Sequence, residues 1–236
     1  MKSVGRVSSL QTFATLDGPG VRFAVFLQGC PLRCVCCHNP ETWDISAGEE
    51  YTAEALFEKA KRYSSYFGAK GGVTLSGGEP LMQAEFASEF FALCKNAGIN
   101  TCLDTSGCII NDKVKRLLSL TDYCLLDIKY ATDEKYKKYV GCGIDTPLEF
   151  LKLLDNNGIT TRVRQVIING INDTPQDMRA LAALTAKYKC VEETELLPFK
   201  KFCISKYEEK GVNFKLKDTP EITQEKINEL KKYLCC

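Results

Sequence analysis

The stretch VRFAVFLQGCPLRCVCCHNP, residues 21–40, joins a strand-like run to a loop that holds four cysteines and the only histidine of the chain. The first eight residues are mostly aliphatic or aromatic, which predicts a β-strand over 21–28. The cysteine loop begins where this strand ends. The same order, a strand followed by an unusual polar or glycine-rich loop, recurs along the chain, and this recurrence decides the fold.

Five further runs of this kind follow, and helical patterns separate them. The six expected strands span residues 21–28, 72–76, 99–105, 122–129, 160–168 and 191–197. The expected helices span residues 52–67, 82–97, 112–120, 146–158, 174–188 and 223–234. Thr52, Thr146 and Thr174 are the expected N-caps, the last two with Pro as the first helical residue. Strands that alternate with helices predict a parallel sheet with right-handed crossovers, either an open doubly wound sheet or a partial barrel.

The composition is that of an ordinary globular protein. Of 236 residues, 44% are hydrophobic and 26% are charged, and no Pro/Gly/Ser-rich linker divides the sequence, so we expect one domain over residues 1–236. The formal net charge of +1 gives no reason to expect a nucleic acid or an anionic membrane as partner. No apolar run is long enough to span a bilayer, and the first residues lack a secretory signal, which predicts a cytoplasmic protein.

Polar, glycine-rich or charged clusters stand at the ends of five expected strands. The cysteine loop follows the first strand, and the other clusters are SGGEP (76–80), DTSG (104–107), LLDIK (125–129) and LPFKK (197–201). Because the loops at the carboxyl ends of parallel strands converge on one mouth, we expect these clusters to form a single site.

The cysteine loop has the spacing of a metal or cluster site. Cys30, Cys34 and Cys37 follow a C-x3-C-x2-C pattern, whose offsets fall on one side of a tight helical turn, whereas Cys36 falls on the far side. Three thiolates are one short of a closed structural zinc site. An iron–sulfur cube held by three thiolates leaves one iron open to an outside ligand. A zinc site that adds His38, and a thiol–disulfide pair of Cys34 and Cys37, remain as alternatives.

The other cysteines and the basic runs have simpler interpretations. Cys94, Cys102, Cys124 and Cys190 lie in apolar patterns and are expected to be small buried hydrophobic side chains. Cys235 and Cys236 end the sequence and are assigned no role. The basic runs at 135–138 and 200–201 are expected to be solvated faces.

Taken together, the motifs resemble those of a known superfamily. The C-x3-C-x2-C loop, GGEP, DTSG and DIK resemble the radical S-adenosylmethionine superfamily. With TFATLDGPGVR (12–22) and CHNPETWD (37–44), the chain is similar to the activating enzymes of glycyl-radical enzymes over nearly its whole length. The fold that we expect is therefore α/β, a partial (β/α)6 TIM-like barrel of parallel strands with outer helices.

The resemblance implies a 4Fe–4S cluster and S-adenosylmethionine as cofactors. Cys30, Cys34 and Cys37 would hold the cluster, and its open iron would bind the amino and carboxylate groups of S-adenosylmethionine. Main-chain groups after the second strand would hold the methionine amino group, namely those of Ser76, Gly77, Gly78 and Glu79. Glycine suits this place because only a backbone without a side chain approaches a ligand so closely.

The resemblance also implies a monovalent cation, K⁺ or Na⁺, beside the methionine carboxylate. Its oxygen ligands would be Asp104, Thr105, Asp127 and the carbonyl of Leu125. Asp104 and Lys129 would orient the sulfonium substrate. The residues near the incoming glycine loop of the partner would be Asp17, His38 and Asn39. Of all these residues, we expect the three cysteines, Lys129 and Asp17 to be catalytic.

The activity that the resemblance implies is activation of a glycyl-radical enzyme. An electron from the reduced cluster would cleave S-adenosylmethionine, and the 5′-deoxyadenosyl radical would take a hydrogen atom from a glycine of the partner. No cysteine lies between Cys37 and Ser76, where some related enzymes carry a cysteine-rich insert, which favours a partner of the pyruvate formate-lyase type. The expected electron donor is a flavodoxin or ferredoxin. The alternatives are an activase of anaerobic ribonucleotide reductase and a non-catalytic iron–sulfur electron carrier.

Two positions depart from the family pattern. Cys36 stands before the third cluster cysteine, where the superfamily usually has an aromatic residue on the adenine side. Lys200 follows LPF, where the family commonly has His. We expect Lys200 to line the mouth with Asp17 and His38, either as a hydrogen-bond donor to the glycine loop or as a solvated bystander.

Overall fold

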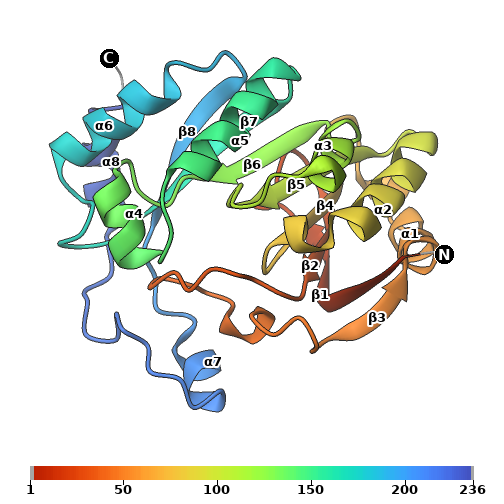
Figure 1. The fold of residues 1–236 in the computed structure, drawn as a ribbon, viewed down its shortest axis with the longest axis horizontal. Helices are drawn as coiled ribbons and strands as arrows, with labels where there is room; N and C mark the ends of the chain where they lie inside the picture. Colours follow the sequence, from red (N-terminus) through yellow and green to blue (C-terminus); the bar gives the residue numbers. More distant parts are fainter. Residues whose placement is uncertain (1–2, 235–236) are drawn as a thin grey trace.

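Residues 3–234, which the computed structural model describes, form one sheet of eight strands in the order β3-β1-β2-β4-β5-β6-β7-β8 (Figure 1). In this part of the chain six strands pair in parallel: β2 (Arg22–Leu27), β4 (Gly72–Gly77), β5 (Asn100–Thr105), β6 (Tyr123–Asp127), β7 (Thr160–Ile167) and β8 (Val191–Pro198). All six expected strands are confirmed within a few residues. Because β3 and β8 are the two edges of the described sheet, the barrel is partial, as expected.

Two antiparallel strands were not expected from the sequence. β1 (Val4–Ala14) pairs with β2, and β3 (Glu49–Thr52) pairs with β1 at the edge. β1 buries Val7 and Ala14, but its middle residues are half-exposed or exposed. β3 is only four residues long and has the sequence EEYT. Neither segment has the apolar run of a central strand, so the pairing of β1 with β2 and of β3 with β1, rather than local preference, makes them strands.

All six expected helices are present, although each is shorter than expected. The helices are α1 (Ala53–Lys61), α2 (Ala84–Asn96), α3 (Asp112–Leu118), α4 (Asp133–Tyr139), α5 (Asp145–Asn156), α6 (Pro175–Thr185), α7 (Ile204–Glu209) and α8 (Gln224–Lys231). The 3-10 turns are η1 (Pro40–Thr42), η2 (Ser64–Tyr66) and η3 (Pro80–Gln83). The short helices α4 and α7 were not expected. In Figure 1, α2 and α3 lie beside β4 and β5 and α1 lies beside α2 near β3, whereas α5, α6 and α8 flank β7 and β8.

The helix caps are confirmed in two of three cases. The side chains of Thr52 and Thr174 accept hydrogen bonds from the N–H groups of Ala55 and Asp177. The prediction for Thr146 is wrong, because α5 begins at Asp145 and Thr146 lies inside its first turn. Thr146 and Pro147 fit in the first turn of the helix because the first N–H groups of a helix have no partner within the helix. Proline, which has no N–H, therefore removes no hydrogen bond there.

The two faces of the parallel strands differ in chemistry. The face under the helices is apolar and fully buried, with side chains that include Val73, Leu75, Leu103, Leu126 and Val163. Side chains alternate between faces along a strand, so the intervening positions point into the barrel. Those inner positions carry polar groups near the carboxyl ends, namely Ser76, Asp104, Asp127 and Arg164.

The simpler expectations are mostly confirmed. Cys94, Cys102 and Cys124 are fully buried and Cys190 is half-buried. The basic run at 135–138 is not wholly solvated, because Tyr136 is buried. Cys235 and Cys236 lie outside the described residues. Within residues 3–234, the helices are all too short or too polar to cross a membrane.

Candidate active site

A cavity of about 340 Å³ lies where the strand ends and the following loops meet. It brings together most of the residues predicted for the site: Asp17, Cys30, Cys34, Cys37, His38, Asn39, Ser76, Gly77, Gly78, Glu79, Asp104, Thr105, Asp127 and Lys129. Two predicted residues, Leu125 and Lys200, do not line it. The convergence of clusters from separate strands on one mouth is therefore confirmed.

The three predicted thiols line this cavity as free cysteines. Cys30, Cys34 and Cys37 are half-buried, and burial raises the pKa of Cys30 to about 12 and that of Cys34 to about 11. The Lys129 ammonium acts in the opposite direction and lowers the pKa of Cys34. Cys36 lies in the same wall but is 9% exposed and packs into the hydrophobic core.

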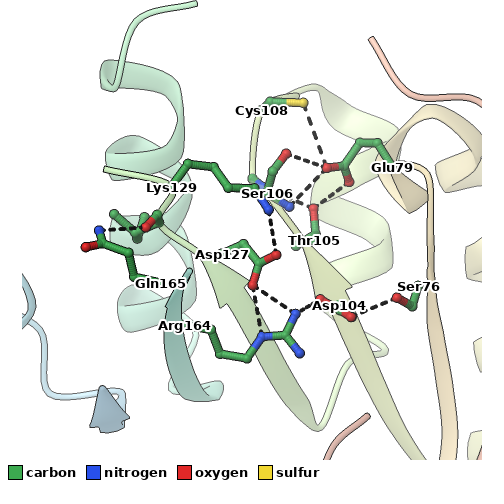
Figure 2. Close-up of polar contacts among 12 residues, drawn as sticks. Ser76, Glu79, Asp104, Thr105, Ser106, Cys108, Asp127, Lys129, Arg164 and Gln165 are labelled. Atoms are coloured by element: carbon green, nitrogen blue, oxygen red, sulfur yellow. Dashed lines mark hydrogen bonds and ion pairs between the residues drawn. The ribbon is translucent and has the colours of Figure 1, made fainter. Parts of the chain in front are cut away.

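A charged centre lies on the inner face (Figure 2), and its residues line the same cavity as the three thiols. Arg164 donates from Nε to Asp127 at 2.9 Å and also pairs through Nη2 with Asp104. Lys129 donates to the other oxygen of Asp127 at 2.7 Å, and the Ser76 hydroxyl donates to Asp104 at 2.7 Å. Neighbouring register positions on three parallel strands thus bring two acids and an arginine into contact.

The two carboxylates of this centre differ in acidity. Burial raises the pKa of Asp104 to about 6, although Arg164 opposes the shift. Burial also disfavours ionisation of Asp127, but Arg164 and Lys129 outweigh it and hold the pKa of Asp127 at about 2. The difference follows from the number of cations, since Asp127 contacts two and Asp104 contacts one.

Glu79 joins the GGEP and DTSG segments (Figure 2). Its carboxylate is 1% exposed and accepts hydrogen bonds from the Thr105 hydroxyl at 2.5 Å and from the N–H and hydroxyl of Ser106 at 3.0 and 2.5 Å. The Leu81 N–H donates to the same carboxylate at 3.2 Å. The Thr105 hydroxyl is therefore turned towards Glu79 and away from the face that carries Asp104.

The fold leaves no room for a side chain at either glycine of GGEP. A Cβ on Gly77, which has a φ of +106°, would lie 2.4 Å from the Leu27 nitrogen. A Cβ on Gly78 would lie 2.3 Å from the Gly29 carbonyl oxygen. The requirement for glycine therefore comes from close packing on the end of β2, whereas the sequence led us to expect it from a ligand.

The residues predicted near the mouth are held by short contacts. The Asp17 carbonyl accepts the Thr74 hydroxyl at 2.6 Å, and burial raises the pKa of the Asp17 carboxyl. His38 contacts the Lys200 carbonyl through Nε2 at 2.9 Å, and burial lowers the pKa of His38. A neutral imidazole that donates its Nε2 hydrogen to this carbonyl agrees with both the contact and the lowered pKa. The Lys200 ammonium turns to Glu221 at 3.1 Å instead.

Comparison with known proteins identifies the family. The Radical SAM superfamily model matches residues 24–184, which include the cysteine loop and the charged centre. The chain is 42% identical to the pyruvate formate-lyase-activating enzyme of Clostridium pasteurianum, over 98% of this chain and 97% of that protein. The chain belongs to the radical SAM superfamily and, within it, to the pyruvate formate-lyase-activating enzyme family.

Other relatives of this radical SAM protein agree. The pyruvate formate-lyase 1-activating enzyme of Escherichia coli K12 is 38% identical over 98% of this chain and 95% of that protein. A solved domain of a pyruvate-formate lyase-activating enzyme from Bacteroides vulgatus covers 70% of this chain and 92% of its own length, with a TM-score of 0.57 at 20% identity. A radical SAM methyltransferase from Sphaerobacter thermophilus covers 90% of this chain and 63% of its own length, with a TM-score of 0.64 at 16% identity. The two structures support the partial-barrel fold.

As a radical SAM protein, the chain uses a 4Fe–4S cluster and S-adenosylmethionine. The donor set fits, because three thiols and a nearby ammonium face one cavity, and thiolates are the ligands of such clusters. Among the described residues, the Trp43 Nε1 atom is buried without a hydrogen-bond partner. Within residues 3–234 no three His, Cys, Asp or Glu side chains are arranged to hold a single ion.

Arg164 is the site residue that sequence reasoning missed in this radical SAM protein. It lies in the expected strand TTRVRQVII, where arginines alternate with smaller or apolar residues. A charged residue at alternate positions of a strand between two covered faces is unusual. That signal marks Arg162 and Arg164 as inward-facing, and the register then puts Arg164 directly beside Asp127.

Proposed function

We propose that the chain activates a glycyl-radical enzyme of the pyruvate formate-lyase type. One observation carries the proposal: three thiols and a buried centre of two acids, an arginine and a lysine line the same cavity. Relatives of about 40% identity over more than nine-tenths of the chain are named pyruvate formate-lyase-activating enzymes, which supports the partner class.

The proposed roles follow from the chemistry of each group. Cys30, Cys34 and Cys37 hold the 4Fe–4S cluster as thiolates. When bound, the cluster and S-adenosylmethionine supply a reductive cleavage and a 5′-deoxyadenosyl radical, which removes a hydrogen atom from a glycine of the partner. Lys129 and Asp104 orient the sulfonium substrate, and the backbone of residues 76–79 binds its amino group. Asp17, His38 and Asn39 receive the glycine loop at the mouth.

Four finer elements belong to the same proposal: a monovalent cation, an electron donor, the cellular compartment and the domain organisation. A monovalent cation binds Asp104 and Asp127 beside the methionine carboxylate, with Thr105 and the Leu125 carbonyl as further ligands. It shares the two carboxylates with Arg164, which already contacts both. A flavodoxin or ferredoxin donates the electron, and the protein works in the cytoplasm as a single domain over residues 1–236.

The test mixes the reconstituted protein, reductant and S-adenosylmethionine with pyruvate formate-lyase from the same organism, without oxygen. We expect a glycyl doublet in the electron paramagnetic resonance spectrum and release of 5′-deoxyadenosine. The doublet should weaken in Asp17→Ala and persist in Asp218→Ala, a matched change at an exposed aspartate. If the doublet forms only with anaerobic ribonucleotide reductase, the proposed partner class is wrong. If the protein holds a cluster but releases no 5′-deoxyadenosine from S-adenosylmethionine, it is an electron carrier.

A further inference from the structure

A second, smaller cavity of about 230 Å³ adjoins the candidate active site. Phe26 and Asn39 line both cavities, so the two meet at these side chains. The rest of its lining comes from β1, from η1 and from α7: Ser8, Ser9, Gln11, Glu41, Thr42 and Lys206. We call this cavity the β1 groove. Of its residues, the function proposed above uses only Asn39.

The β1 groove lies on the same face of the sheet as the active site. Ser9 pairs with Phe26 in the antiparallel ladder of β1 and β2, and Gln11 lies two residues further along β1. Paired residues share a face and side chains alternate along a strand, so Ser9 and Gln11 face the inside of the barrel as Phe26 does. Leu10, between them, packs against the core on the other face. A polypeptide on the inner face can therefore extend from the groove into the active-site cavity.

The partial barrel leaves this part of its inner face open. β1 lies next to the edge strand β3, and β8 forms the opposite edge of the described sheet. Ser9 and Gln11 are exposed although they point into the barrel. Among residues 3–234, the side chains of Ser8, Ser9 and Gln11 form no hydrogen bond. The groove therefore offers unpaired donors and acceptors on the open side of the barrel.

A β-bulge directs two consecutive hydroxyls to the groove. The register of β1 and β2 shifts between Val7 and Ser9, so Ser8 is the extra residue. In a regular strand Ser8 would point away from Ser9, but both line the groove. Bulges are common next to active sites, where they redirect a side chain. This bulge is the local feature that makes the strand wall of the groove polar.

The charged residues of the groove neutralise each other. Lys206 pairs with Glu41, and its ammonium also donates to the Asn39 side-chain oxygen at 2.9 Å. α7 packs against η1, which holds Lys206 at this corner. The other polar lining residues are uncharged. Neutral hydroxyls and a carboxamide match the N–H and C=O groups of a peptide backbone, whereas an anionic ligand would require a cation without a partner.

We propose that the β1 groove binds the backbone of the segment next to the target glycine of the partner enzyme, with Ser8, Ser9 and Gln11 as its hydrogen-bonding residues. The inference rests on the proposed function, because it takes the partner to be a glycyl-radical enzyme whose glycine reaches the active-site cavity. A glycine enters the cavity together with the residues that flank it. The open, polar part of the same face is the place where these residues lie. Their binding holds the glycine Cα in position for the reaction.

A triple variant removes the three side chains: Ser8→Ala, Ser9→Ala and Gln11→Ala. Folded pyruvate formate-lyase from the same organism is the probe, and the initial rate at which the glycyl doublet forms is measured against its concentration, without oxygen. We expect the KM for this partner to rise about tenfold and kcat to fall by less than about twofold, because the lost contacts bind partner and transition state equally.

The matched control changes three exposed residues of the same types elsewhere: Ser64→Ala, Ser65→Ala and Gln176→Ala. It should leave the KM unchanged. If the triple variant of the groove also has the wild-type KM, the inference is wrong while the proposed function stands. If wild-type protein forms no glycyl doublet with this partner, the proposed function fails and the inference fails with it.

Synthetic peptides with the glycine-loop sequence of the same pyruvate formate-lyase test the backbone contact on the unaltered protein. Each peptide carries one methyl group on a backbone nitrogen beside the glycine, and calorimetric titration of the reconstituted protein with S-adenosylmethionine measures its affinity. We expect one such peptide to bind wild type about tenfold more weakly than the unmethylated peptide, and the triple variant only about twofold more weakly. If no methylated peptide binds more weakly, or if the loss is equal in both proteins, the groove does not bind the backbone.

Discussion

The carboxylates of Asp104 and Asp127 share one guanidinium, that of Arg164. The two acids lie on adjacent strands, β5 and β6, and Arg164 enters from β7. The chain therefore supplies a positive charge at the place where a bound cation was expected to lie between the acids. In the function proposed above, Arg164 and the cation would share one electrostatic task, which is to keep two acids compatible with a third carboxylate from the substrate.

Arg164→Met removes this charge while keeping an elongated side chain. Two buried carboxylates then lose a partner, so the free energy of unfolding should fall by about 3–5 kcal/mol. Urea unfolding of the cluster-free protein measures the change. Adding Asp104→Asn should restore part of the loss, because it removes one of the uncompensated charges. Arg116→Met, at an exposed arginine, is the control, and an equal effect there would rule out the proposed task of Arg164.

The cation at Asp104 and Asp127 predicts that S-adenosylmethionine binding depends on the monovalent ion. Replacing K⁺ or Na⁺ by choline, which is too large for the site, should weaken binding about tenfold, or ~1.4 kcal/mol. Asp127→Ala should weaken binding in every salt and remove this dependence. Calorimetric titration of the reconstituted protein at constant ionic strength measures both effects. If the affinity for S-adenosylmethionine is equal in K⁺, Na⁺ and choline, Arg164 alone compensates the negative charges of Asp104 and Asp127.

Cys30, Cys34 and Cys37 should each be necessary for the cluster, and Cys36 should not. Each of the three Ala variants is expected to lose iron, sulfide and visible absorption after anaerobic reconstitution. Cys36→Ala should retain all three and lose about 1 kcal/mol of stability, since it removes one buried heavy atom from the core. A Cys36→Ala protein that folds but holds no cluster would show that Cys36 is a ligand.

Glu79→Gln should destabilise the turn that links GGEP to DTSG. Oε1 of the carboxylate accepts hydrogen bonds from Thr105 and Leu81, and Oε2 accepts from the N–H and hydroxyl of Ser106 and, at 3.9 Å, from the Cys108 thiol. An amide retains one oxygen, so at least two donors lose their acceptor and the loss should be about 3 kcal/mol. Urea unfolding compares it with Glu134→Gln at an exposed glutamate, which should stay within about 0.5 kcal/mol of wild type.

The raised pKa of Asp17 predicts a pH dependence of stability with a definite sign. Burial is the main cause, and Arg164 and Arg22 oppose it. The folded protein then holds the Asp17 proton more tightly than the unfolded chain, so this contribution to stability is present below the ordinary value of 3.8 and is lost as pH rises through the folded pKa.

Asp17→Asn cannot ionise, so it serves as the reference. The unfolding free energy of wild type minus that of Asp17→Asn should decrease as pH rises from about 4 and then level off, as linkage requires. Urea unfolding of the cluster-free protein at several pH values gives this difference. Asp218→Asn controls for the loss of one exposed charge. A difference that increases with pH would show that Asp17 is stabilised as a carboxylate.

The parallel strands and the convergence of their loops could be predicted because both depend on local pattern. Apolar runs bounded by turn residues mark β2 and β4–β8, and a parallel sheet sends all the following loops to one end. The one-sided spacing of Cys30, Cys34 and Cys37 is also local. The sequence by itself therefore determined the parallel α/β sheet, the convergence of its loops and the three cysteines, whereas the partial barrel and the other site residues were implied by the resemblance to the radical S-adenosylmethionine superfamily.

Tertiary structure alone decided how the side chains of the site are partnered. Arg164 meets Asp104 from sixty positions away, and Trp43 is held by Tyr207 of α7, because strand register and loop packing bring distant segments together. β1 forms because β2 offers free backbone groups, and the edge strand β3 forms because β1 offers them in turn. Lys200 is a further example: its motif predicted a position at the mouth, but its ammonium pairs with Glu221 and does not line the cavity. Partner choice depends on distances across the fold, and no local pattern contains them.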